Sequence, residues 1–279
     1  MVKFMVKEET KGEITILISN IFFAITAILV KLVPGIFDGF FISFIRFIVG
    51  IILCVLFIKF LKSGFKVHGK IFWILRGFCG AGAMILYFVS IQMTSSGRAT
   101  LLTNTFPIFV ALFGFLFFKE KVRLYNIISI ILCIIGIFLV FYDGSKYPLT
   151  GDILGLIAAI MAGFAVIFLK GLREKNNSII IYLPVCLFGL LLTSFSAGQI
   201  VSVNIPILII LITTGVAAFF AQIFMTYGFK FVSSTRGSII TFSKIPMTIV
   251  LSFFVGEEFK FKFIIGTILI IIGLVVNRK

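Results

Sequence analysis

Long apolar runs, each bounded by charges, glycines or prolines, dominate this 279-residue chain. Ten of them are long enough to be membrane-spanning helices, because about 20 apolar residues cover the hydrocarbon thickness of a bilayer. The segments between the runs are short, and none is polar enough to form a soluble domain. The pattern predicts an all-α membrane protein with ten transmembrane helices, at residues 14–33, 40–61, 70–92, 97–118, 123–142, 152–171, 179–197, 205–231, 234–255 and 260–277.

The composition agrees with a membrane protein, since 61% of the residues are hydrophobic and only 13% are charged. Soluble domains contain about 45–50% apolar and about 25% charged residues. The net charge of +15 does not indicate nucleic-acid binding, because the basic residues stand mainly in short segments between apolar runs. The first apolar run exceeds the 7–15 residues of the apolar core of a signal peptide, so we interpret it as the first membrane helix.

The distribution of basic residues predicts the orientation. With the N-terminus in the cytoplasm, most of the 25 Lys and Arg fall on the inner side, and few fall on the outer side. Lys and Arg are enriched in cytoplasmic loops. We expect a multi-pass protein of a bacterial cytoplasmic membrane with both termini inside, in contact with membrane lipids.

The fourth and ninth runs are similar in sequence. They read "TSSGRATLLTNTFPIFVALFGFLFFKEKV" and "VSSTRGSIITFSKIPMTIVLSFFVGEEFK", with prolines at Pro107 and Pro246. A spacing of 138 or 139 residues between matching positions indicates a duplication, with units at 1–143 and 144–279. Because each unit contains an odd number of helices, five, the second unit is inverted in the membrane. Inverted repeats are typical of alternating-access transporters.

The stretch "SSGRATLLTNTFPIFVALFGFLFFKEKVRLYNIISIILCIIGIFLV" resembles the EamA branch of the drug/metabolite transporter superfamily. The resemblance covers essentially the whole chain and implies a secondary transporter of small metabolites, often an amino-acid exporter, with a central cavity between the two units. It rests on the small residues that begin the fourth and ninth helices and on Pro107, Pro246, Glu120, Glu258, Gly136, Gly273 and Arg46. Many relatives have an acidic or neutral residue where this chain has Lys244, which argues against a cationic drug or polyamine.

Lys244 is the first candidate for substrate binding, because it lies about ten residues from either end of the ninth predicted helix. A charge at a helix centre costs about 2.5–3.5 kcal/mol on insertion and usually faces a wet cavity. Helical spacing places Thr241, Lys244 and Thr248 on one polar stripe. A carboxylate or phosphate of the substrate would supply the missing counter-charge. Two alternatives stay open: Lys244 binds carbonyls freed by Pro246, or it is neutral and carries a proton.

Further candidates come from polar residues of other helices. The polar residues of the fourth helix could instead form hydrogen bonds that hold neighbouring helices together. The tyrosines could instead belong to an aromatic belt at the membrane interface. Arg46 and Arg76 could instead extend their charged ends to the membrane surface. The substrate-binding candidates besides the stripe are Thr100, Asn104, Thr105, Tyr87, Gln222, Tyr227 and Arg46, and the hinge candidates are Pro107 and Pro246.

The remaining residues narrow the function. All ten acids fall in the tail, in loops or at helix ends, so a carboxylate proton relay is not expected. The cysteines lack metal-binding spacing and the chain has one histidine, so we expect no metal and no cofactor. We expect a transporter of an amino acid or related anionic solute, not an enzyme. The alternatives are an exporter of uncharged or cationic compounds and, more remotely, a membrane scaffold or an intramembrane lipid enzyme. The sequence leaves open a homodimer.

Overall fold

The computed structural model describes residues 2–60, 65–118, 144–232, 237–238 and 240–276, together with isolated positions between 128 and 142. Every regular element among these residues is a helix, which confirms the all-α prediction for the described part of the chain. The fifth predicted helix, 123–142, lies mostly outside the described residues, as do Glu120 and Arg236.

The first half of the chain forms long apolar helices joined by short connections, at positions close to those predicted. The third helix is followed by a short helix and, after a break of two residues, by another apolar helix. These elements are α1 (Val2–Leu32), α2 (Gly39–Phe60), α3 (Lys70–Met93), α4 (Ser96–Thr103) and α5 (Phe106–Phe118).

The second half has the same order: long helices come first, and a helix that is interrupted near a proline follows them. Its elements are α7 (Leu149–Leu172), α8 (Ser178–Thr193), the 3-10 helix η1 (Ser194–Ser202), α9 (Ile205–Gly228), the 3-10 turn η2 (Thr241–Ser243), α11 (Lys244–Phe253) and α12 (Phe261–Val276).

Six helical segments of the described chain are long and apolar enough to cross a membrane, and shorter apolar helices accompany them. The six segments are Glu8–Leu32, Gly39–Phe60, Lys70–Met93, Leu149–Leu172, Ser178–Ser202 and Ile205–Gly228. The protein is therefore a multi-pass membrane protein.

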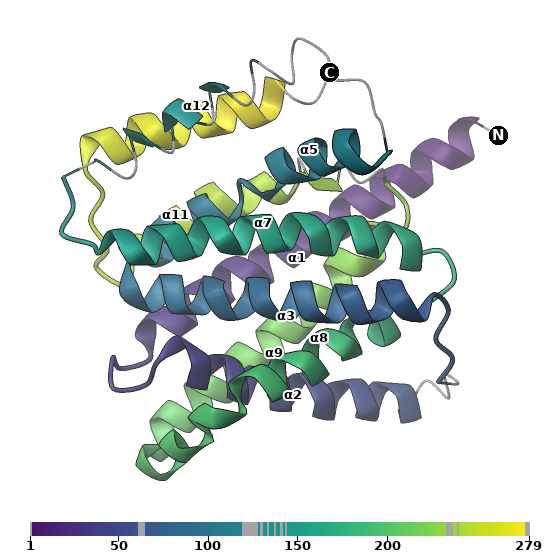
Figure 1. Cartoon of the computed structure of the whole chain (residues 1–279), viewed down its shortest axis with the longest axis horizontal. Helices are drawn as coiled ribbons and strands as arrows, with labels where there is room; N and C mark the ends of the chain where they lie inside the picture. Colours follow the sequence, from purple (N-terminus) through teal and green to yellow (C-terminus); the bar gives the residue numbers. More distant parts are fainter. Residues whose placement is uncertain are drawn as a thin grey trace.

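The helices lie side by side in one bundle, with α12 on one flank and α2 on the other (Figure 1). The main helix pairs join the two halves of the chain, since α3 packs on α7, α1 on α9 and α2 on α8. Small residues allow close approach, as is common between membrane helices. A Cβ atom on Gly228 of α9 would lie only 2.8 Å from the Gly12 carbonyl oxygen of α1.

The fourth and ninth predicted helices are both interrupted shortly before their prolines. Asn104 and Thr105 separate α4 from α5, and Pro107 is the second residue of α5. In the second half, η2 precedes α11, whose third residue is Pro246. Proline lacks an N–H and crowds the preceding turn, but it fits the first turn of a helix. Lys244 therefore begins α11. The residues just before it, from Ile240 through η2, are helical as well, so Lys244 lies within a helical run whose winding changes at η2.

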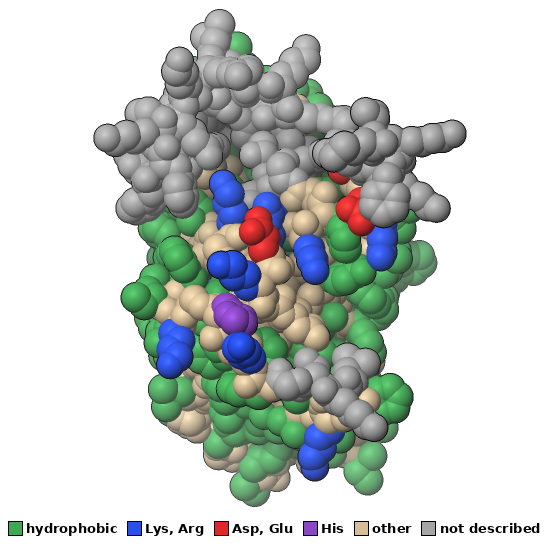
Figure 2. Space-filling view, turned by 90° about the vertical axis from the view of Figure 1, so that its right-hand side faces the viewer, with side chains coloured by type: hydrophobic (Ala, Val, Ile, Leu, Met, Phe, Trp, Pro, Cys, Tyr) green, Lys and Arg blue, Asp and Glu red, His purple; other side chains and the backbone are tan. Residues whose placement is uncertain are grey.

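One end of the bundle, where α3 begins and α7 ends, is rich in basic side chains. Figure 2 shows Lys and Arg side chains around the single histidine on this face. The loops are joined there, because Asn176 Nδ2 donates to the His68 carbonyl at 3.1 Å and Arg173 Nη1 donates to the Phe229 carbonyl at 2.6 Å. This end carries the positive charge expected of a cytoplasmic face.

Candidate solute-binding cavity

A cavity of about 70 Å³ lies inside the bundle, between elements of both halves. It is lined from the first half by α1, α3, α4, α5 and the break between α4 and α5, and from the second half by α7, α9, η2 and α11. One water molecule needs about 10–15 Å³ of such space, so the cavity has room for about five water-sized groups. An amino acid such as glutamate has about ten non-hydrogen atoms, so the lining must move apart when a solute of that size binds.

Lys244 lines the cavity and is buried, with 9% of its surface exposed. Its ammonium nitrogen lies 4.9 Å from the ring centroid of Phe23 and 5.4 Å from that of Tyr87. Aromatic faces attract cations without neutralising them. Among the described residues, no hydrogen-bond acceptor contacts the ammonium, and no Asp or Glu lines the cavity. The positive charge therefore has no protein counter-charge in this part of the structure.

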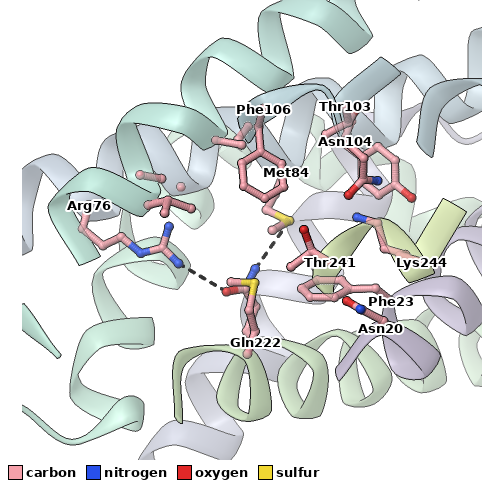
Figure 3. A pocket seen from close by; sticks show the side chains of 17 residues that line it. Asn20, Phe23, Arg76, Met84, Thr103, Asn104, Phe106, Gln222, Thr241 and Lys244 are labelled. Atoms are coloured by element: carbon pink, nitrogen blue, oxygen red, sulfur yellow. Dashed lines mark hydrogen bonds between the residues drawn. The ribbon is translucent and has the colours of Figure 1, made fainter. Parts of the chain in front are cut away.

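A second cation, Arg76, lines the same cavity from α3 (Figure 3). Its side chain is 4% exposed, so the expectation that Arg76 snorkels to an interface is wrong. Its Nη2 donates to Gln222 Oε1 at 3.4 Å, a long contact, and its Nε has no partner. Packing of α3 against both α7 and α8 is what buries this arginine.

The amide of Gln222 is oriented by Arg76. A guanidinium only donates, so the Gln222 oxygen faces Arg76 and the nitrogen faces the cavity. This nitrogen lies 3.9 Å from the Met84 sulfur, which is a weak acceptor. The Arg76 end of the cavity therefore offers donors.

Two asparagines present fixed acceptors near Lys244. Asn20 Nδ2 donates to the Ile240 carbonyl at 2.9 Å, and Asn104 Nδ2 donates to the Thr100 carbonyl at 2.6 Å. A flipped amide would place two oxygens together, so these bonds fix the orientation of both side chains. Both Oδ1 atoms are buried, and neither has a hydrogen-bond partner among the residues that the structure describes. Buried acceptors without partners are rare in proteins and call for an explanation.

The structure gathers five of the sequence-predicted candidates in this cavity, namely Lys244, Thr241, Asn104, Tyr87 and Gln222. Thr100 stands behind the lining, where its hydroxyl is 2.6 Å from the Tyr87 hydroxyl. Two other buried candidates, Thr105 and Thr248, do not line the cavity. Tyr227 lies apart, near the N-terminal part of α1, with its ring 5.3 Å from the Lys11 ammonium nitrogen.

Arg46 of α2 lies outside the cavity lining and is fully buried. Its guanidinium carbon lies 5.1 Å from the Phe47 ring centroid and 5.3 Å from that of Phe88, and its nitrogens have no hydrogen-bond partner. The alternative that it snorkels is therefore wrong as well.

Other lining residues were absent from the predicted site: Asn20, Phe23, Arg76, Met84 and Thr103. Asn20 had a sequence signal, because it interrupts the first apolar run at "ISNIFF". Phe23 and Met84 had none, since one phenylalanine among 37 and one methionine among apolar neighbours look like ordinary packing.

Two acids assigned by sequence to a loop and a helix end are in fact buried. Asp152, in the first turn of α7, accepts two 2.6 Å hydrogen bonds from the Arg98 guanidinium of α4. Glu257 accepts the backbone N–H groups of Ser96 and Gly97, where α4 begins, at 2.6 and 3.2 Å. Both contacts join the two halves of the chain at the end opposite the basic face.

Comparison with known proteins fits this architecture. The model of the EamA-like transporter family matches the chain twice, at residues 10–142 and 149–278. The chain belongs to the EamA-like transporter family. The resemblance seen in the sequence is thereby confirmed, and the family indicates a transporter rather than an enzyme.

Individual relatives of this EamA-like protein are distant and differ in length. Solute carrier family 35 member G1 of Mus musculus is 28% identical over 62% of this chain, and the match spans only half of the mouse protein. An uncharacterized transporter of Clostridium kluyveri is 26% identical over 96% of this chain and 93% of its own length. The pseudopaline exporter CntI of Pseudomonas aeruginosa is 22% identical over 80% of each chain.

A solved crystal structure shares the fold of the EamA-like chain. It aligns with a TM-score of 0.66 over 96% of this chain and 97% of the other, at 14% sequence identity. The likeness concerns the fold alone.

Proposed function

We propose that the protein is a secondary transporter of a small organic carboxylate, with amino acids as the leading class, in the cytoplasmic membrane of a bacterium. The observation that carries the proposal is Lys244, a buried cation in a cavity whose described lining contains no acid. A buried charge is stable only when it is paired or solvated. A carboxylate of the solute supplies the pair.

The two buried acceptors favour an amino acid over a simple carboxylate. Asn20 Oδ1 and Asn104 Oδ1 lack protein donors, and both side chains lie beside Lys244 in Figure 3. An α-amino acid carries a carboxylate next to an ammonium group. The carboxylate would bind Lys244, while the ammonium would donate to the asparagine oxygens.

We further propose that the chain contains two inverted repeats of five membrane helices, residues 1–143 and 144–279. The support comes from the two successive matches to the family model and from the paired interruptions before Pro107 and Pro246. Alternating access would follow from bending at these interruptions, with the two prolines as hinges. The cavity between the halves would then open to each side in turn.

Replacement of Lys244 tests the proposal. Purified protein is reconstituted in vesicles preloaded with the common L-amino acids, and counterflow uptake of each labelled amino acid is measured. The wild type should accumulate at least one of them, and Lys244→Ala should lose about 90% or more of this uptake, because an uncompensated solute carboxylate would be desolvated. Monodisperse elution in detergent checks that the variant is folded.

The matched control is Lys59→Ala, which removes an exposed lysine at the end of α2. It should transport as the wild type does. Wild-type uptake by a folded Lys244→Ala variant would contradict the role of Lys244.

A further inference from the structure

The cavity contains a second cation that the proposed function does not use. Arg76 is only 4% exposed, and the described cavity lining offers it no carboxylate. Arg98 provides a comparison, because this buried arginine is paired with a carboxylate: Asp152 accepts two 2.6 Å hydrogen bonds from its guanidinium. Within the described part of the chain, the one hydrogen-bond contact of Arg76 is the long one to the neutral Gln222 amide.

Arg76 and Lys244 occupy different ends of the cavity. Arg76 and Tyr87 lie eleven residues apart on α3, so about 16 Å of helical rise separates their Cα atoms, and the Arg76 guanidinium reaches from its Cα toward Gln222. The Lys244 ammonium stands against the Tyr87 ring. In Figure 3, Met84, Gln222 and Thr241 lie between the guanidinium and the ammonium. One small carboxylate would therefore not pair with both cations.

The two ends also differ in hydrogen-bonding character. The Lys244 end combines a cation with the two free asparagine oxygens, which suits an α-carboxylate beside an α-ammonium group. The Arg76 end combines a guanidinium with the inward-facing amide nitrogen of Gln222, so it offers donors to an anion. Met84 lies between the ends, and its flexible thioether can adapt to the chain that joins the two groups of the solute.

We propose that Arg76 binds a second anionic group, so that the solute is an α-amino dicarboxylate, an amino acid with an acidic side chain. This inference rests on the proposed function and specifies its substrate. The α-carboxylate binds Lys244, the ammonium group donates to Asn20 and Asn104, and the side-chain carboxylate accepts from Arg76 and Gln222. Arg76 is then the residue that separates acidic amino acids from their neutral amides.

Competition between acids and amides tests this assignment. Counterflow of labelled L-glutamate and L-aspartate is measured in vesicles, with L-glutamine and L-asparagine as near-isosteric competitors. In the wild type the acids should compete better than the amides by about tenfold or more, because a charge-assisted hydrogen bond is lost with the amide. In Arg76→Gln the preference should fall to about one, while exchange of the amides persists.

Further variants separate recognition from folding. Arg76→Lys keeps the charge and should retain part of the acid preference. Gln222→Leu removes one donor and should lower the preference, so it tests the assignment if the Arg76→Gln variant does not fold. Lys59→Gln, a change of an exposed cation at the end of α2, should leave the acid-to-amide ratio unchanged.

The outcomes distinguish the acidic-amino-acid assignment from the broader proposal of amino-acid transport. If amides compete as well as acids in the wild type, the role of Arg76 is wrong and amino-acid transport stands. If none of the four compounds exchanges but another amino acid does, the dicarboxylate assignment is wrong and the proposed function stands. If no amino acid exchanges at all, both are wrong as stated.

Discussion

At the scale of single residues, the protein treats its buried arginines in three ways. Arg98 is paired with a carboxylate, Arg46 packs between aromatic rings, and Arg76 faces the cavity. The sequence does not distinguish these cases, because Arg46 and Arg76 both stand in apolar surroundings and the small residues around Arg98 do not indicate its carboxylate partner. The difference arises from which neighbouring helix supplies an acid, a ring or an empty space.

The pair of Arg98 and Asp152 gives a prediction about stability. Arg98→Met leaves the Asp152 carboxylate buried next to an apolar side chain and should destabilise the protein by about 3–5 kcal/mol. The double variant Arg98→Met with Asp152→Leu should recover most of this loss, since no buried charge remains unpaired. Thermal unfolding in detergent measures both. A double variant as unstable as the single one would show that the pair itself, rather than its disruption, provides the stability.

At the scale of elements, α4 is held at its start by a residue of the other half. The Glu257 carboxylate accepts two backbone N–H groups of α4, where the helix dipole favours a negative charge. Because α4 leads into the interruption before Pro107, this contact fixes one end of the segment expected to move. We call this contact the Glu257 latch and expect it to hold the two halves together at the end opposite the basic face.

Weakening this latch should make the start of α4 more accessible. The reporter is Ser96→Cys, at a position whose native hydroxyl is buried without a partner, in a chain with its four native cysteines replaced by alanine. Adding Glu257→Gln removes the charge and should speed maleimide labelling of the introduced thiol several-fold, because two charge-assisted bonds are lost. Glu258→Gln changes the exposed neighbouring glutamate and should leave the rate unchanged. Equal rates in both variants would exclude the latch.

The elements were more predictable than the site. The lengths of the apolar runs gave helix positions close to those observed, since bilayer thickness fixes the length of a spanning helix. The prolines marked where the fourth and ninth helices are interrupted. By contrast, Arg76 and Asp152 stand near segment ends, where a linear sequence suggests contact with water. Their burial comes from the packing of α3 against α7 and α8 and of α4 against α7.

At the scale of the whole molecule, the charge distribution predicts the orientation. The end at which α3 begins and α7 ends, with His68 and Arg173, carries the basic cluster, whereas Lys146 precedes α7 and Lys260 precedes α12 at the other end. Positive charge is retained on the cytoplasmic side. The bundle should therefore place both termini inside the cell.

Labelling of intact cells checks this orientation. In the background without native cysteines, Lys146→Cys should react with a membrane-impermeant maleimide in whole cells, because Lys146 is exposed on the predicted outer side. Lys175→Cys, exposed on the basic face, should react only after the cells are opened. The reverse pattern would invert the topology and move the Glu257 latch to the cytoplasmic side.

The pair of cavity cations also bears on the energetics of the transport cycle. When the empty cavity closes, Arg76 and Lys244 lose water and repel one another without a described counter-charge. When a solute with two carboxylates closes inside, each cation keeps a partner. If the solute is the proposed dicarboxylate, we expect the loaded carrier to reorient over a lower barrier than the empty one, which favours exchange of one solute molecule for another over return of the empty carrier.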